Sequence, residues 1–79
     1  MTGAGGQLGR DLGRRLPPDT TRLATREELD VADAGAAAAL AAEGAPTVVI
    51  HTAAMTNVDA CEGDRERAQA INAGGARNV

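Results

Sequence analysis

The 79 residues carry a formal net charge of −3, include eight arginines but no lysine, and contain no aromatic side chain. A chain of this length has room for one small domain, and its acidic balance argues against a nucleic-acid partner. One cysteine, Cys61, cannot form an internal disulfide, and neither a leader-like segment nor an apolar run long enough to span a bilayer is visible. These features predict a cytoplasmic protein without a membrane partner.

The first nine residues, MTGAGGQLG, form a glycine-rich stretch in which Gly3, Gly6 and Gly9 recur at every third position. In such a turn one glycine reverses the chain, a second lets the backbone approach a phosphate, and a third lets the following helix pack closely. The free N–H groups at the start of that helix would point toward the anion. The pattern predicts a site for a cofactor pyrophosphate, and a plain loop is the alternative because short glycine turns are common.

The first half of the chain predicts one helix and one strand. Leu8, Leu12 and Leu16 recur at four-residue spacing and predict a helix over residues 7–16 with a narrow apolar stripe, which a Pro-Pro pair ends. The next segment, residues 20–25, is rich in β-branched side chains and predicts a short strand.

The second half repeats this order. Residues 34–43 are rich in alanine and follow Asp33, a good N-cap, so a helix is predicted there. The β-branched run 47–50 is typical of a strand buried on both faces of a parallel sheet. Residues 55–61 are expected to be irregular or a short helix, and a last helix begins near residue 64. This alternation predicts an α/β fold with right-handed crossovers.

Four blocks stand in order along the chain: TGAGGQLG, LDVAD, HTAAMTNVDACE and INAGGARN. Together they resemble the N-terminal part of the dTDP-4-dehydrorhamnose reductase family, in the extended short-chain dehydrogenase/reductase superfamily. The resemblance implies a Rossmann-type, doubly wound parallel sheet that binds NADPH or NADH, and hydride transfer to the keto group of a nucleotide-sugar. Residues 1–79 would then be the N-terminal part of the dinucleotide-binding domain, without its first strand and without the substrate domain. A homodimer is a further expectation for the parent protein.

The resemblance also implies roles for individual residues. Gly6, Gln7 and Leu8 match the pyrophosphate loop, and the Asp-Val pair matches a pair that borders the adenine. The Ala-Ala-Met sequence matches a wall along the adenosine and ribose, and the threonine after it lies near the nucleotide-sugar substrate. The expected cofactor-binding residues are Gly3, Gly6, Gln7, Leu8, Gly9, Arg26, Asp30, Val31, Ala53, Ala54 and Met55, and the expected substrate-binding residue is Thr56.

Two of these residues have equally simple explanations. Asp30 could be a loop carboxylate or part of a capping arrangement with Asp33, and its distance from the glycines also suits a ribose-binding acid. Arg26 either holds a 2′-phosphate, which would favour NADPH, or is a solvated side chain paired with Glu27 or Glu28.

Three further residues are expected to be structural. His51 stands where the family commonly carries asparagine, so a hydrogen-bonded role at a strand end is expected and no chemistry is assigned to it. Cys61 is expected to be a small packed side chain. Asn72 matches an asparagine with which the superfamily braces its central strands.

The superfamily's catalysis rests on a tyrosine that is assisted by a lysine four residues later, and this chain contains neither residue type. That pair is therefore expected after Val79. An apolar strand is likewise expected before the glycine turn, with Met1 in the slot of its last valine and a GTG codon read as the start. An epimerase or dehydratase of the same superfamily and a non-catalytic dinucleotide-binding subunit remain alternatives, while the GQLG turn and the AAMTNVDACE loop favour the reductase.

Overall fold

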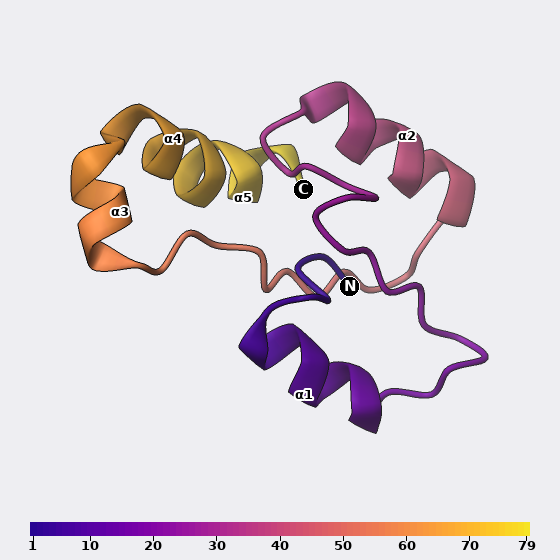
Figure 1. Ribbon diagram of the computed structural model, residues 1–79. Coiled ribbons are helices and arrows are strands. Elements are labelled where there is room, and N and C mark those ends of the chain that lie inside the picture. The colour runs from indigo at the N-terminus through magenta and orange to yellow at the C-terminus, as the bar shows by residue number, and fades with distance from the viewer.

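The computed structural model describes all 79 residues, and its regular elements are helical. In chain order they are α1 (Gln7–Arg15), α2 (Ala34–Gly44), α3 (Val58–Gly63), α4 (Arg65–Gln69), the π-helical stretch η1 (Ala70–Gly74) and α5 (Gly75–Asn78). The last three follow one another without a break and form one continuous helix. Figure 1 shows α1 on one side of the extended backbone and the other helices on the opposite side.

Three extended segments of the chain lie side by side. The first of them, at Thr2, lies between the other two. Thr2 forms parallel bridges with Ala24 and with His51. The N–H of Thr2 donates to Ile50 O at 3.0 Å, and the N–H of Ala24 donates to Met1 O at 2.9 Å. The parallel direction agrees with the predicted α/β order. Met1 and Thr2 pair in the central position, as the placing of Met1 at the end of the first strand implies, but they form isolated bridges and not a strand.

The strands predicted over residues 20–25 and 47–50 are wrong in extent, because each pairing is a single bridge. A strand forms where a neighbouring backbone accepts and donates its hydrogen bonds, and the first residues of the chain reach only the carboxyl ends of these segments. Val48 and Val49 are 75% and 49% exposed, so their predicted burial on both faces is also wrong.

The predicted helices are confirmed, and their beginnings have local causes. The Asp33 side chain accepts a hydrogen bond from the N–H of Ala36 at 3.0 Å, as predicted for the N-cap of α2. Asn57 caps α3 in the same way through Ala60, also at 3.0 Å. Asp64 caps the last helix near the predicted position. These three helices therefore begin at a side chain that satisfies one of their free N–H groups, whereas α1 begins after Gly6 without a side-chain cap.

A small core lies between the bridged segments and the helices α2 and α5. Eight of the 79 residues are buried. The core cluster consists of Ala24, Leu29, Val31 and Ala37. Gly75 lets α5 approach this cluster, because a Cβ at that position would lie 2.7 Å from Val31 Cγ2. The cluster thus supports the backbone turn that contains the predicted adenine-bordering residues.

None of the helices combines the length and the apolar character that crossing a membrane requires.

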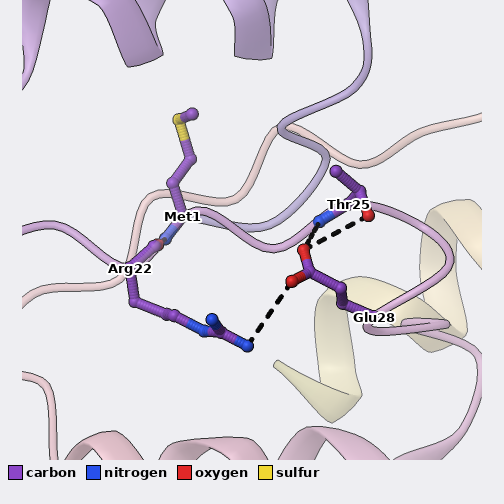
Figure 2. Close-up of polar contacts among 4 residues, drawn as sticks. All are labelled: Met1, Arg22, Thr25 and Glu28. Atoms are coloured by element: carbon purple, nitrogen blue, oxygen red, sulfur yellow. Dashed lines mark hydrogen bonds and ion pairs between the residues drawn. The ribbon is translucent and has the colours of Figure 1, made fainter. Parts of the chain in front are cut away.

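Figure 2 shows a polar turn that follows the Ala24 bridge. The Glu28 carboxylate accepts from the Thr25 N–H at 2.9 Å and from the Thr25 hydroxyl at 3.2 Å, and the Arg22 guanidinium lies 3.7 Å from its other oxygen. The Thr25 backbone bond, then its hydroxyl, and then the charge of Arg22 hold the pKa of Glu28 below its ordinary value of 4.5. The amino group of Met1 donates to Arg22 O, which ties this turn to the first segment.

We expect Glu28→Gln to lower the thermal unfolding midpoint slightly at neutral pH and to leave it unchanged in acid. Because the folded-state pKa is lowered, the carboxylate contributes stability above about pH 4.5, and this contribution is lost as the pH falls through the lower folded value. Circular dichroism melts at neutral pH and at about pH 2 would measure the difference. Glu27→Gln is the matched control, since Glu27 is exposed and makes no ion pair. Equal melts of Glu28→Gln and the wild type at neutral pH would contradict the assignment.

Candidate functional site

The glycine turn lies against the start of α1, where the sequence predicts it. Gly3 has a φ of +71°, and a Cβ built on it would lie 2.5 Å from Ala53 N and 2.7 Å from Thr52 Oγ1. A Cβ on Gly9 would overlap the carbonyl oxygen of Gly3, so α1 sits directly on the turn. Both positions therefore require glycine, one for its backbone conformation and both for lack of space.

The turn presents unpaired N–H groups. The N–H of Gly6, the N-cap of α1, donates to Gly3 O at 3.0 Å and closes the turn. Gly5, Gln7 and Leu8 are exposed, and their N–H groups donate to no backbone acceptor in the chain. These donors stand at the positive end of the helix dipole. A set of such donors fits a phosphate oxyanion, and Gly5 is a donor that the sequence analysis did not assign.

Thr52 holds the turn in place, a role that sequence reasoning missed. Its hydroxyl lies within hydrogen-bond distance of two carbonyl oxygens, Thr2 O at 2.8 Å and Gly3 O at 3.2 Å. The Thr2 hydroxyl in turn lies 2.6 Å from Nδ1 of His51, whose predicted structural hydrogen bond is confirmed. The only sequence feature that pointed to such a role for Thr52 was its hydroxyl, which follows a predicted strand. These contacts join the first segment to the one that leads into the predicted ribose wall.

Asp30 and Val31 lie in a tight turn before α2. Asp30 Oδ1 accepts from the N–H of Ala32 at 3.0 Å, and Asp33 N–H donates to Asp30 O at 2.9 Å. The Asp30 carboxylate is therefore a turn-forming group, one of the roles left open by the sequence, and it stays exposed. Val31 is 4% exposed and belongs to the core cluster. Its side chain faces the core, so only its backbone is available to a ligand.

The predicted ribose wall follows the His51 bridge and is braced at Met55. The N–H of Met55 donates to Asn72 Oδ1 at 2.7 Å, and Met55 O accepts from Asn72 Nδ2 at 3.0 Å. Cys61 also points its thiol at Met55 O, at 3.3 Å. Asn72 thus braces the backbone, as the resemblance implies, but at the segment after the bridge rather than within it. Ala54 and Thr56 flank this braced residue and are exposed.

The structure brings some predicted residues together and leaves others apart. Ala53 lies against the glycine turn at Gly3, so this turn and the predicted ribose wall are neighbours. Arg26 is exposed and forms no ion pair, and Glu28 pairs with Arg22. Of the two interpretations left open, the pairing of Arg26 with Glu27 or Glu28 is therefore wrong, whereas its exposure agrees with a solvated side chain.

No group of three or more histidine, cysteine, aspartate or glutamate side chains is arranged to hold a metal ion.

Comparison with known proteins gives consistent matches. The family model described as the RmlD substrate-binding domain matches residues 1–79. A dTDP-4-dehydrorhamnose reductase of Mycolicibacterium smegmatis is 40% identical over 81 residues, which cover 100% of this chain and 24% of the relative. A probable dTDP-4,6-dihydroxy-2-methyloxan-3-one 4-ketoreductase of Streptomyces antibioticus is 41% identical over 75 residues, which cover 92% of this chain and 25% of the relative.

One similar solved structure is the dTDP-4-dehydrorhamnose reductase of Bacillus anthracis in complex with NADP. It matches with a TM-score of 0.87 at 40% identity, over 99% of this chain and 29% of that protein. The chain thus spans about a quarter of the length of the relatives that it matches.

Proposed function

This chain belongs to the RmlD substrate-binding domain family, and from that premise we propose that it binds the pyrophosphate of NADPH or NADH as the cofactor-binding part of a nucleotide-sugar 4-keto reductase. The observation that carries the proposal is the glycine turn, which presents unpaired N–H donors and packs too closely for side chains at Gly3 and Gly9. The family description speaks of substrate binding, whereas these donors fit a dinucleotide phosphate. The relative from Bacillus anthracis, a complex with NADP, supports this choice.

The residues around the turn suit the rest of such a cofactor. The Asp30–Val31 backbone would border the adenine, and the segment Ala53–Met55 would border the adenosine and ribose. Arg26 has no ion-pair partner, so its guanidinium is available for a 2′-phosphate, which favours NADPH over NADH. The cofactor would supply a hydride to the keto group of the sugar, and Thr56 would lie toward that substrate.

The fold supports the same proposal. We regard the three bridged segments as the carboxyl ends of parallel strands in a Rossmann-type, doubly wound sheet, with Thr2 in the middle and helices on both sides. In such sheets ligands bind beyond the carboxyl ends of the strands, where the glycine turn lies here. Residues 1–79 would form the N-terminal part of the dinucleotide-binding domain. In the whole protein, other residues would supply the acid–base pair and the nucleotide-sugar domain. That protein would be a cytoplasmic, homodimeric reductase that forms dTDP-L-rhamnose.

The proposal is tested by removing one N–H donor without disturbing the helix. Gln7 is the first residue of α1 and follows Gly6, whose backbone is extended, with φ −77° and ψ 173°. Proline is well suited to this first helical position, and its predecessor must be extended, so Gln7→Pro removes the N–H while keeping the fold. Gln7→Ala is the control, since it removes the side chain and keeps the N–H.

We expect inorganic pyrophosphate and NADPH to shift the amide resonances of Gly5, Gln7 and Leu8 in the wild type, with weak affinity on the order of 1 mM. Gln7→Pro should weaken pyrophosphate binding about tenfold, the loss expected for one charge-assisted hydrogen bond, and Gln7→Ala should not. NMR titration of the labelled chain measures both. Unchanged pyrophosphate affinity in Gln7→Pro, or no shift in the wild type, would refute the proposed site.

A further inference from the structure

We infer that Asn78 is a positioning residue for the adenine side of the nucleotide site, an inference that rests on the proposed function. Its side-chain Nδ2 donates to Val31 O at 3.0 Å and lies 3.3 Å from Ala32 O. The bond joins the last turn of α5 to the backbone turn before α2, across most of the chain's length. Neither composition nor spacing assigned a role to Asn78.

Gly75 explains why Asn78 reaches this turn. Residues three apart on a helix share one face, so Gly75 and Asn78 face the same neighbour. Gly75 is buried, and any side chain there would collide with Val31, since its Cβ would lie 2.7 Å from Val31 Cγ2. The glycine therefore brings the helix backbone close to Val31, and the asparagine one turn later can donate to the carbonyl of the same residue.

The hydrogen bond from Asn78 completes the bonding of the turn. The Asp30 carboxylate accepts from Ala32 N–H, and Asp33 N–H closes the turn onto Asp30 O. The carbonyls of Val31 and Ala32 accept no backbone hydrogen bond, so Asn78 is the group that satisfies them. Because the Val31 side chain is buried, a ligand at this turn would meet backbone atoms and the Asp30 carboxylate. The position of those atoms thus depends on Asn78.

A second asparagine of the same continuous helix holds the other backbone segment predicted to border the adenosine. Asn72 pairs with both backbone groups of Met55, and it lies in the π-helical stretch η1, directly before α5. A π-helical stretch changes the rotation between the residues before and after it, and such stretches are common at functional sites. One helix therefore supports both backbone segments that would enclose the adenosine.

The test replaces only the donor. Asn78→Asp keeps the size of the side chain but exchanges the NH₂ group for an oxygen, which would face two carbonyl oxygens. Asn57→Asp is the matched control, because Asn57 acts through its oxygen as the acceptor from Ala60 N–H, and aspartate caps a helix equally well. The same chemical change should therefore disturb one site and spare the other.

We expect Asn78→Asp to weaken the binding of AMP, the adenosine half common to NADH and NADPH, about tenfold or more. The shift of the Gln7 amide resonance on addition of pyrophosphate should be the same in Asn78→Asp as in the wild type. A general loss of structure would abolish that shift. Asn57→Asp should match the wild type with both probes. NMR titrations of the full 79-residue chain with AMP and with inorganic pyrophosphate provide all these values.

A readout in the wild type keeps the inference testable if Asn78→Asp does not fold. The side-chain NH₂ resonances of Asn78 should shift on addition of AMP together with the Ala32 N–H, and their failure to move would overturn the inference. If the wild type binds pyrophosphate and Asn78→Asp binds AMP with wild-type affinity, only this inference fails. If the wild type binds neither probe, the proposed function fails as well.

Discussion

Gly3→Ala is expected to remove most of the stability of the folded chain. Alanine at a φ of +71° costs about 1–2 kcal/mol, and its Cβ would lie 2.5 Å from Ala53 N in tightly placed backbone, which adds about 1–3 kcal/mol. A chain of this size is stabilised by only about 3–5 kcal/mol. Urea unfolding followed by circular dichroism should show a loss of the cooperative transition or a much lower midpoint.

Gly44→Ala is the control for this prediction. Gly44 ends α2, has no neighbouring atom within 4 Å of the place that a Cβ would take, and does not have a positive φ. Alanine there should leave stability unchanged or raise it by up to about 1 kcal/mol, because alanine is the better helix former. A urea midpoint of Gly3→Ala equal to that of Gly44→Ala would show that the turn does not depend on a glycine at position 3.

Leu29→Ala is expected to have an effect of similar size for a different reason. Leu29 is 6% exposed and is the largest side chain of the four-residue core cluster. Shortening a buried leucine to alanine typically costs about 2–5 kcal/mol, through lost burial and the cavity left behind. Because the core is so small, few neighbours are available to fill the space. The free energy of unfolding in urea is the quantity to compare with the wild type.

Two control variants are compared with Leu29→Ala. Leu29→Met conserves volume and should cost less than about 1.5 kcal/mol. Val58→Ala removes an apolar side chain that is 74% exposed, and it should stay within about 0.5 kcal/mol of the wild type. If Leu29→Ala had the same urea midpoint of unfolding as the wild type, the cluster around Ala24 would not be the core of this chain.

The helices and their caps were predictable because their causes are local. Asp33, Asn57 and Asp64 each satisfy an N–H group three residues later, so both partners of each bond lie within one short stretch of sequence. The glycine turn was predictable for a similar reason, since the conformational freedom of Gly3 and the start of α1 lie within a few residues of each other.

The pairing of extended segments was less predictable, because it joins distant residues. Thr20 to Thr25 and Thr47 to Ile50 have the composition of strands, yet each segment pairs only at its carboxyl end, where Thr2 lies beside Ala24 and His51. The composition of a segment indicates its preference for extended backbone. It does not indicate how long the neighbouring segment is with which it could pair. Arg26 is a local case instead, since its neighbour Glu28 is engaged by Thr25 and Arg22, only a few residues away.

The sequence by itself determined the approximate positions of the helices, the glycine turn and the family, because each depends on residues close together or on blocks in a fixed order. Only the tertiary structure decided which groups hold the predicted site in place. Thr52 reaches back to Thr2 and Gly3, Asn72 reaches Met55, and Asn78 reaches Val31. These bonds join residues far apart in the chain, and their formation depends on how closely the backbones approach, which at α5 is set by a buried glycine.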